Sequence, residues 1–134
     1  MLFDINRIKL DVEASDWQQA IIKSAEDMLC QNMITPNYVH QMINLVKKYG
    51  PYIVISKEIA LAHAAGSDGV IIPGASIIML AKPVKFGKDG FDPASVIFCN
   101  AIEDSREYVN ALMKIISIAK NPPFLNMLKS TKCL

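Results

Sequence analysis

A single imidazole is the side chain in this sequence best suited to chemistry. His63 stands at the end of an apolar run of strand character that begins at Gly50, and every residue flanking the histidine is small. A neutral imidazole is a nucleophile near pH 7, because its ordinary pKa is about 6.5. The small neighbours would let a second macromolecule approach the ring closely. We therefore interpret Gly50–Gly66 as a docking site for group transfer between proteins.

The other nucleophilic and metal-binding residue types form no comparable arrangement. His40 is predicted on the flank of a helix, with no acid, cysteine or second histidine at a useful spacing, so we interpret it as a solvated surface residue. The three cysteines are widely spaced and match neither a disulfide framework nor a zinc site. We expect Cys30 and Cys99 to be buried apolar residues and Cys133 to be exposed. No metal or cofactor is expected.

Composition and charge exclude several classes of protein. The 134 residues, of which 51% are hydrophobic, fit one domain spanning residues 1–134. The net charge of +1 is interspersed, and nucleic-acid binding is not expected because no basic stripe is present. The start of the chain turns polar at Asp4, and the apolar run Ile71–Ala81 is interrupted by Pro73. These features predict a protein of the cytoplasm with no membrane segment.

Helix and strand signals alternate along the chain. Ser15–Gln18 is typical of a capping box and predicts a helix ending near Gln31, while Thr35 and Pro36 predict a second helix to about Tyr49. A third helix is predicted from Asp104 or Ser105, followed by a short last helix after Pro123. The predicted strands are Ile8–Val12 at a sheet edge, Tyr52–Ile55, Ile59–His63, Ser76–Leu80 and Ala94–Cys99, with a loop at Lys85–Pro93.

Strands interleaved with helices imply an α/β fold. The expected arrangement is a three-layer sandwich in which a central mixed β-sheet is flanked by helices. In that arrangement the apolar, β-branched strands are buried and the imidazole of His63 lies at a strand end, where a partner can reach it.

The order and spacing of several segments resemble one protein family. These segments are Ile34–Val39 with Met42 and Ile43, then Gly50–Ile55, Ile59–His63 and Lys82–Gly87. Together they are similar to the enzyme IIA domains of the bacterial sugar phosphotransferase system, of the mannitol, fructose and ascorbate type. Asp16–Ala20 and Phe91–Pro93 resemble the ascorbate branch most.

The resemblance implies a function for His63. In the family, the matching histidine accepts a phosphoryl group from the histidine-containing phosphocarrier protein and passes it to a cysteine of enzyme IIB. The chain would then be a phosphotransferase component serving uptake of ascorbate or a related sugar, with the membrane permease enzyme IIC as an indirect partner. Phosphoryl transfer mainly requires positioning and charge stabilisation.

The chain departs from the family pattern around the histidine. Lys57 and Glu58 stand where members commonly have proline and glycine, Ala62 stands where they have proline, and Ala64–Ala65 replace a nearby arginine. Either Glu107 or Tyr108 occupies the position of a usual second histidine. Lysines could supply the missing positive charge, and the candidates are Lys47, Lys82 and Lys85.

The C-terminus differs from the family as well, because members usually continue into one more helix. We expect the chain to lack this final helix and to leave an apolar strip that a second copy could cover, forming a homodimer. Two other functions stay open because of the departures near His63. One is a regulatory domain that senses phosphorylation, and the other is a degenerate interaction module that accepts no phosphoryl group.

Overall fold

The computed structural model describes residues 3–101 together with residues 114 and 117. The described part contains a five-stranded sheet with strand order β1-β4-β5-β3-β2. β1–β4 and β5–β3 pair in parallel, whereas β4–β5 and β3–β2 pair antiparallel. The strands are β1 (Phe3–Val12), β2 (Val54–Ser56), β3 (Ile59–Ala62), β4 (Gly74–Val84) and β5 (Ala94–Ala101). The predicted mixed sheet and the edge position of β1 are confirmed.

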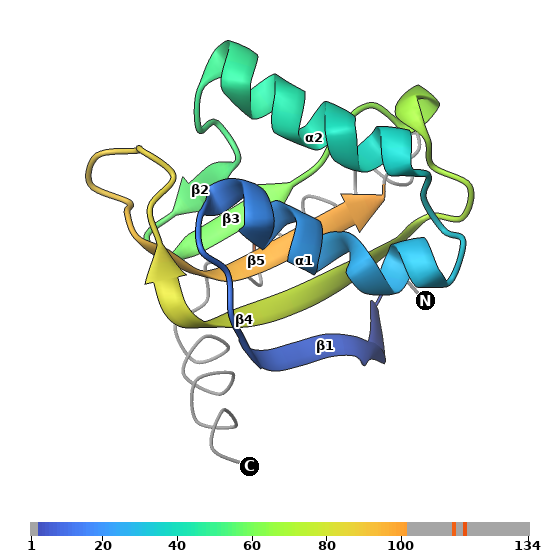
Figure 1. Cartoon of the computed structure of the whole chain (residues 1–134), viewed down its shortest axis with the longest axis horizontal. Coiled ribbons are helices and arrows are strands. Elements are labelled where there is room, and N and C mark those ends of the chain that lie inside the picture. The colour runs from blue at the N-terminus through green and yellow to red at the C-terminus, as the bar shows by residue number, and fades with distance from the viewer. Residues whose placement is uncertain (1–2, 102–113, 115–116, 118–134) are drawn as a thin grey trace.

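Two helices cover one face of this sheet. Figure 1 shows α1 (Trp17–Cys30) lying over β4 and β5, with α2 (Pro36–Tyr49) beside it. Their buried side chains include Ile21, Met28 and Met42, which pack with sheet residues such as Ile97. Burying a side chain of this size stabilises a fold by about 1.5–3 kcal/mol. Both helices were predicted with nearly these bounds. No helix of the described residues is long and apolar enough to cross a membrane.

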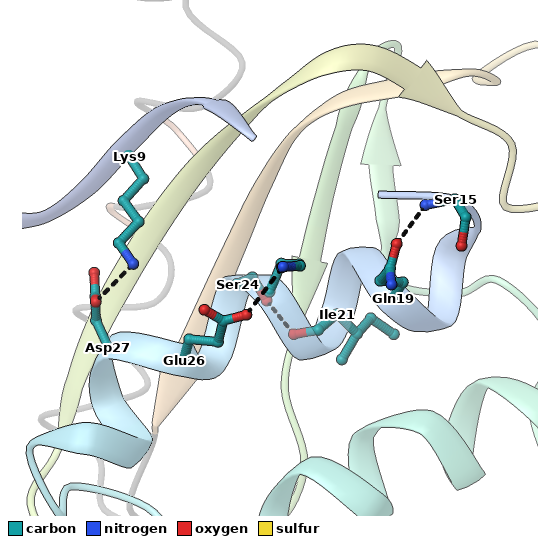
Figure 2. Close-up of polar contacts among 8 residues, drawn as sticks. Lys9, Ser15, Gln19, Ile21, Ser24, Glu26 and Asp27 are labelled. Atoms are coloured by element: carbon teal, nitrogen blue, oxygen red, sulfur yellow. Dashed lines mark hydrogen bonds and ion pairs between the residues drawn. The ribbon is translucent and has the colours of Figure 1, made fainter. Parts of the chain in front are cut away.

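The start of α1 differs in detail from the prediction. Asp16, rather than Ser15, is the N-cap residue, and its Oδ1 accepts a hydrogen bond from the Gln19 backbone N–H at 2.8 Å. Gln19 in turn accepts from the backbone N–H of Ser15 at 2.6 Å through its Oε1 (Figure 2). The reciprocal capping therefore begins one residue later than the sequence pattern indicated, because aspartate and serine are equally good caps.

β1 and β4 are longer than predicted. β1 begins at Phe3 and is tied to α1 by an ion pair between Lys9 Nζ and Asp27 Oδ1 at 3.1 Å (Figure 2). The hydrogen bond and charge of Asp27 raise the pKa of the Lys9 ammonium group. β4 continues through Pro83, where its pairing with β5 is irregular, so the missing N–H of proline interrupts no regular ladder.

The second face of the sheet is also buried. Its side chains alternate with those that face α1 and α2, and include Leu61, Ile77, Val96 and Phe98. A sheet buried on both faces is typical of a layer between two others, as an α/β sandwich requires. The third helix and the short last helix predicted after Asp104, as well as Cys133, lie outside the described residues.

Candidate functional site

His63 is the first residue after β3. This strand is an inner strand, flanked by β5 and β2, and all four of its residues are buried. The strand ends one residue earlier than predicted, at Ala62, and the His63 side chain is partly buried. Ala64 is buried and Ala65 is exposed, so the imidazole stands where the chain leaves the core. This is the strand-end position that the sequence predicted.

The backbone of β3 fixes the tautomer of the imidazole. His63 Nδ1 lies 2.9 Å from the carbonyl oxygen of Leu61, two residues earlier. A carbonyl oxygen can only accept a hydrogen bond, so Nδ1 carries the proton and donates it. In the neutral ring Nε2 is then unprotonated, and none of the described residues forms a hydrogen bond with it. The free lone pair of the ring is therefore on Nε2.

An aromatic ring supports the imidazole from the side. Tyr52, which precedes β2, packs edge to face with His63, with ring centroids 5.5 Å apart and planes at 89°. This geometry lies within the preferred range for aromatic pairs. Tyr52 is 38% exposed, and the burial of the rest of its side chain raises the pKa of its phenol. The hydroxyl therefore stays neutral near pH 7.

Tyr38 connects the residue after the histidine to β5. This fully buried side chain lies in the first turn of α2. Its hydroxyl oxygen accepts a hydrogen bond from the Ala64 backbone N–H at 3.1 Å and donates to the Asn100 carbonyl at 2.6 Å. Tyr38 lies in a segment whose sequence resembles the family, and no role was predicted for it from the sequence. The one feature of the sequence that could have indicated a role for Tyr38 is its polar hydroxyl at a position on the buried face of a helix.

Two of the three candidate lysines, Lys82 and Lys85, lie far from His63. Lys47 is exposed in the last turn of α2. The register pairs Ala62 with Cys99 and Cys99 with Ser76, so Lys82 lies six residues beyond the level of Ala62 along β4, on the side away from His63. At ~3.3 Å per residue this separation is about 20 Å. Lys85 lies further on, so neither of these two lysines belongs to the site.

Other candidate positions contribute little to the site. Glu107 and Tyr108 lie outside the described residues. Cys99 is buried, and burial raises the pKa of its thiol to about 12, which keeps it protonated and unreactive. Cys30 was predicted to be buried but is exposed in the last turn of α1, because it lies off the apolar face of the helix. His40 is exposed on α2, as expected.

No metal site accompanies the histidine in the part of the chain that the structure describes. No group of three or more histidine, cysteine, aspartate or glutamate side chains there is arranged to hold a metal ion. Within these residues the imidazole of His63 contacts the Leu61 carbonyl and the ring of Tyr52.

The hairpin that leads into β3 carries one of the departures from the family pattern. Lys57 and Glu58 form its two-residue turn, and Glu58 has φ of +72°. A left-handed backbone is unfavourable for residues other than glycine. We expect Glu58→Gly to raise the free energy of unfolding by about 0.5 to 1 kcal/mol, measured by urea denaturation.

A matched control for this substitution is the neighbouring residue. Lys57 has no positive φ, so Lys57→Gly should destabilise the chain, since glycine gains nothing there and loses more backbone entropy. A Glu58→Gly variant that unfolds at a lower urea concentration than the wild type would show that the glutamate side chain contributes more than the backbone strain costs.

The fold and the site together define a class of protein. An α/β domain that presents an unprotonated imidazole nitrogen at the end of an inner strand is suited to carry a group on that nitrogen. Residues 1–133 match the family described as "Phosphoenolpyruvate-dependent sugar phosphotransferase system, EIIA 2". The chain belongs to this family, whose members are phosphotransferase components, and the family predicted from the sequence is confirmed.

Individual relatives agree with this assignment. The chain is 26% identical over 132 residues to the ascorbate-specific EIIA component of Salmonella typhimurium, covering 98% of this chain and 86% of the relative. The solution structure of the mannitol-specific cryptic enzyme IIA CmtB from Escherichia coli superposes with a TM-score of 0.84 at 26% identity, covering 95% and 86% of the two chains.

A third comparison concerns the fold alone. The complex of the mannitol enzyme IIA with phosphorylated enzyme IIB from Escherichia coli gives a TM-score of 0.78 at 18% identity, covering 94% of this chain and 87% of the matched chain. The predicted enzyme IIA fold of the mannitol type is thus confirmed.

Proposed function

We propose that this chain is a phosphocarrier enzyme IIA in which His63 accepts and donates the phosphoryl group. The donor is the histidine-containing phosphocarrier protein, and the acceptor is a cysteine of enzyme IIB. Membership of the family supports a phosphocarrier role in general, and the structural neighbour solved together with phosphorylated enzyme IIB supports this choice of acceptor.

The hydrogen bond from Nδ1 to the Leu61 carbonyl carries the proposal. It leaves the lone pair of Nε2 free to attack the phosphorus of the donor phosphohistidine. A new bond forms between Nε2 and phosphorus, while the phosphorus–nitrogen bond of the donor breaks and its electron pair returns to the donor ring. His63 loses no proton in this step, so no general base is required.

The same hydrogen bond stabilises the product. Once Nε2 bears the phosphoryl group while Nδ1 keeps its proton, the ring is positively charged, and the Leu61 carbonyl dipole faces that charge. In the second step a cysteine thiolate of enzyme IIB attacks the phosphorus, and the electron pair of the breaking bond returns to Nε2. Both steps therefore use the same ring orientation, which agrees with a group that is carried and not hydrolysed.

The negative phosphoryl oxygens need positive charge or hydrogen-bond donors. Lys47 is our candidate on α2, and Tyr108 or Glu107 is our candidate from the residues beyond β5. A tyrosine hydroxyl could donate a hydrogen bond to a phosphoryl oxygen, whereas a carboxylate would repel it. Partner proteins could also supply this charge, since both bring their own surface to the imidazole.

The sugar served is proposed from the relatives. The ascorbate-specific components among the relatives favour ascorbate or a related sugar acid, which the permease enzyme IIC would transport. Such a carrier works in the cytoplasm, where phosphoenolpyruvate supplies the phosphoryl groups. No cofactor is part of the proposal, because the donor is a protein.

Transfer to enzyme IIB is the test of this function. The wild-type chain is incubated with phosphoenolpyruvate, enzyme I and the phosphocarrier protein, then separated and mixed with an ascorbate-type enzyme IIB. We expect a mass gain of about 80 Da that is lost in acid and that moves to enzyme IIB within the second incubation. Absence of any gain would contradict the proposal.

The regulatory alternative is favoured by one observation. The proline before the histidine and the arginine after it are replaced by Ala62 and Ala64–Ala65, and no described lysine forms a hydrogen bond with His63. A chain that is phosphorylated but keeps its phosphoryl group in the presence of enzyme IIB would be a sensor. A chain that is never phosphorylated would be an interaction module.

A further inference from the structure

Tyr38 and the residue after the histidine share a hydrogen bond that the transfer chemistry does not explain. The Tyr38 hydroxyl accepts from the Ala64 N–H at 3.1 Å, and a second contact joins it to the Ala64 carbonyl oxygen at 3.2 Å. Both groups belong to the residue that directly follows His63. A side chain from α2 thus holds the backbone at the point where β3 has already ended.

The hydroxyl is itself held from the other side. It carries one proton, and the shorter of its two carbonyl contacts is the 2.6 Å distance to Asn100, so this carbonyl is the acceptor. Asn100 lies near the end of β5, the strand that pairs with β3 in parallel up to Ala62 and Cys99. Beyond this pair, the Tyr38 hydroxyl links the backbones of Ala64 and Asn100 through its two hydrogen bonds, in place of a direct backbone hydrogen bond between the strands.

The anchor lies one residue from the reactive ring. The carbonyl of Leu61, two residues before the histidine, accepts a hydrogen bond from Nδ1 of His63. The hydroxyl of Tyr38 holds the backbone of Ala64, the residue after the histidine, so His63 is constrained on both sides. The family pattern has a proline before the histidine, and proline restricts the residue that precedes it. Here Ala62 gives no such restriction, and the tyrosine hydroxyl constrains the chain on the C-terminal side of His63.

We propose that Tyr38 is a positioning residue for phosphoryl transfer at His63, acting by anchoring the Ala64 backbone to the end of β5. This inference rests on the proposed function of His63. Tyr38 is fully buried, so its hydroxyl is not exposed to an incoming phosphoryl group. Its contribution is to hold the imidazole in the orientation in which Nε2 faces the incoming phosphorus, since small errors in position slow transfer strongly.

Tyr38→Phe is the variant that tests the proposal, because it removes the hydroxyl and keeps the ring. We expect the rate of phosphorylation by the phosphocarrier protein to fall about tenfold at saturating donor. Nitrogen-15 spectra of the His63 ring should show a larger population of the tautomer with the proton on Nε2. An unchanged rate together with an unchanged tautomer would overturn the proposal.

Ser24→Ala is the matched control. Its hydroxyl is also buried and also donates to a backbone carbonyl, that of Ile21 within α1. This variant should lose stability but keep the wild-type rate and tautomer. If both variants slow transfer equally, the effect is one of general stability, and Tyr38 has no positioning role.

Two measurements test the proposal even if the chain accepts no phosphoryl group or if Tyr38→Phe does not fold. The ring tautomer is read in the unphosphorylated protein, so it remains informative if the wild-type chain accepts no phosphoryl group and the proposed function fails. The Ala64 amide of the wild type should exchange with solvent as slowly as the amides of β5. Rapid exchange at Ala64 would overturn the anchor even if Tyr38→Phe did not fold.

Discussion

His63→Ala is expected to abolish phosphoryl uptake completely. Under conditions in which the wild-type chain gains about 80 Da, intact-mass measurement of the variant should show no gain. The reason is chemical, because no other described side chain combines a ring nitrogen free of hydrogen bonds with a strand-end position. Cys99 is buried with a pKa raised to about 12, and its thiolate is not available. The loss should therefore be total and not partial.

The second histidine of the chain is the matched control. His40 is exposed on α2 and has no carbonyl within hydrogen-bond distance to fix its tautomer in the described structure. His40→Ala should take up one phosphoryl group at the wild-type rate. In the wild type, phosphorus–nitrogen coupling should place the phosphoryl group on Nε2 of His63. Phosphoryl uptake by His63→Ala, or loss of uptake in His40→Ala, would show that the assignment of the reaction to His63 is wrong.

Gly69→Ala is expected to cause the largest loss of stability among conservative changes in the described residues. A Cβ at Gly69 would lie 2.0 Å from Thr35 Oγ1 and 3.2 Å from Tyr38 Cβ. The backbone there has φ of +146°, which side chains other than glycine rarely adopt. Strain and overpacking together should lower the free energy of unfolding by about 3 kcal/mol, as measured by urea denaturation.

Two further variants separate strain from steric overlap. Gly90 also has a positive φ, of +85°, but nothing lies within 4 Å of a Cβ at that position, so Gly90→Ala should cost only about 1 kcal/mol. Thr35→Ala removes the overlapping oxygen, which makes no side-chain capping hydrogen bond. In that background the cost of Gly69→Ala should fall by about half. An equal cost in both backgrounds would show that the overlap with the Thr35 oxygen contributes nothing.

The elements that the sequence predicted well are those with strong local signals. Thr35 followed by Pro36 and the apolar spacing of α2 determine that helix almost to the residue. β3 was predicted because its residues are apolar and bounded by polar and glycine-containing segments. The position of His63 at its end followed from the same pattern, and the family membership from the order of several short motifs.

The features that the sequence did not predict depend on contacts between distant residues. Whether Cys30 is buried depends on which side of the last turn of α1 meets the sheet, and the cysteine type alone does not decide this. The role of Tyr38 depends on a hydrogen bond to Asn100, 62 residues away. The distance of Lys82 from His63 follows from the antiparallel register of β4, which sequence spacing does not contain.

The hydrogen bond between His63 and the Leu61 carbonyl makes regioselectivity a property of the fold. In an unfolded chain, or in a peptide copied from this segment, both ring nitrogens would be open to a small phosphoryl donor. In the native chain one of them is masked by its own backbone. Phosphorylation at Nδ1 would therefore show that this hydrogen bond was absent when the reaction took place.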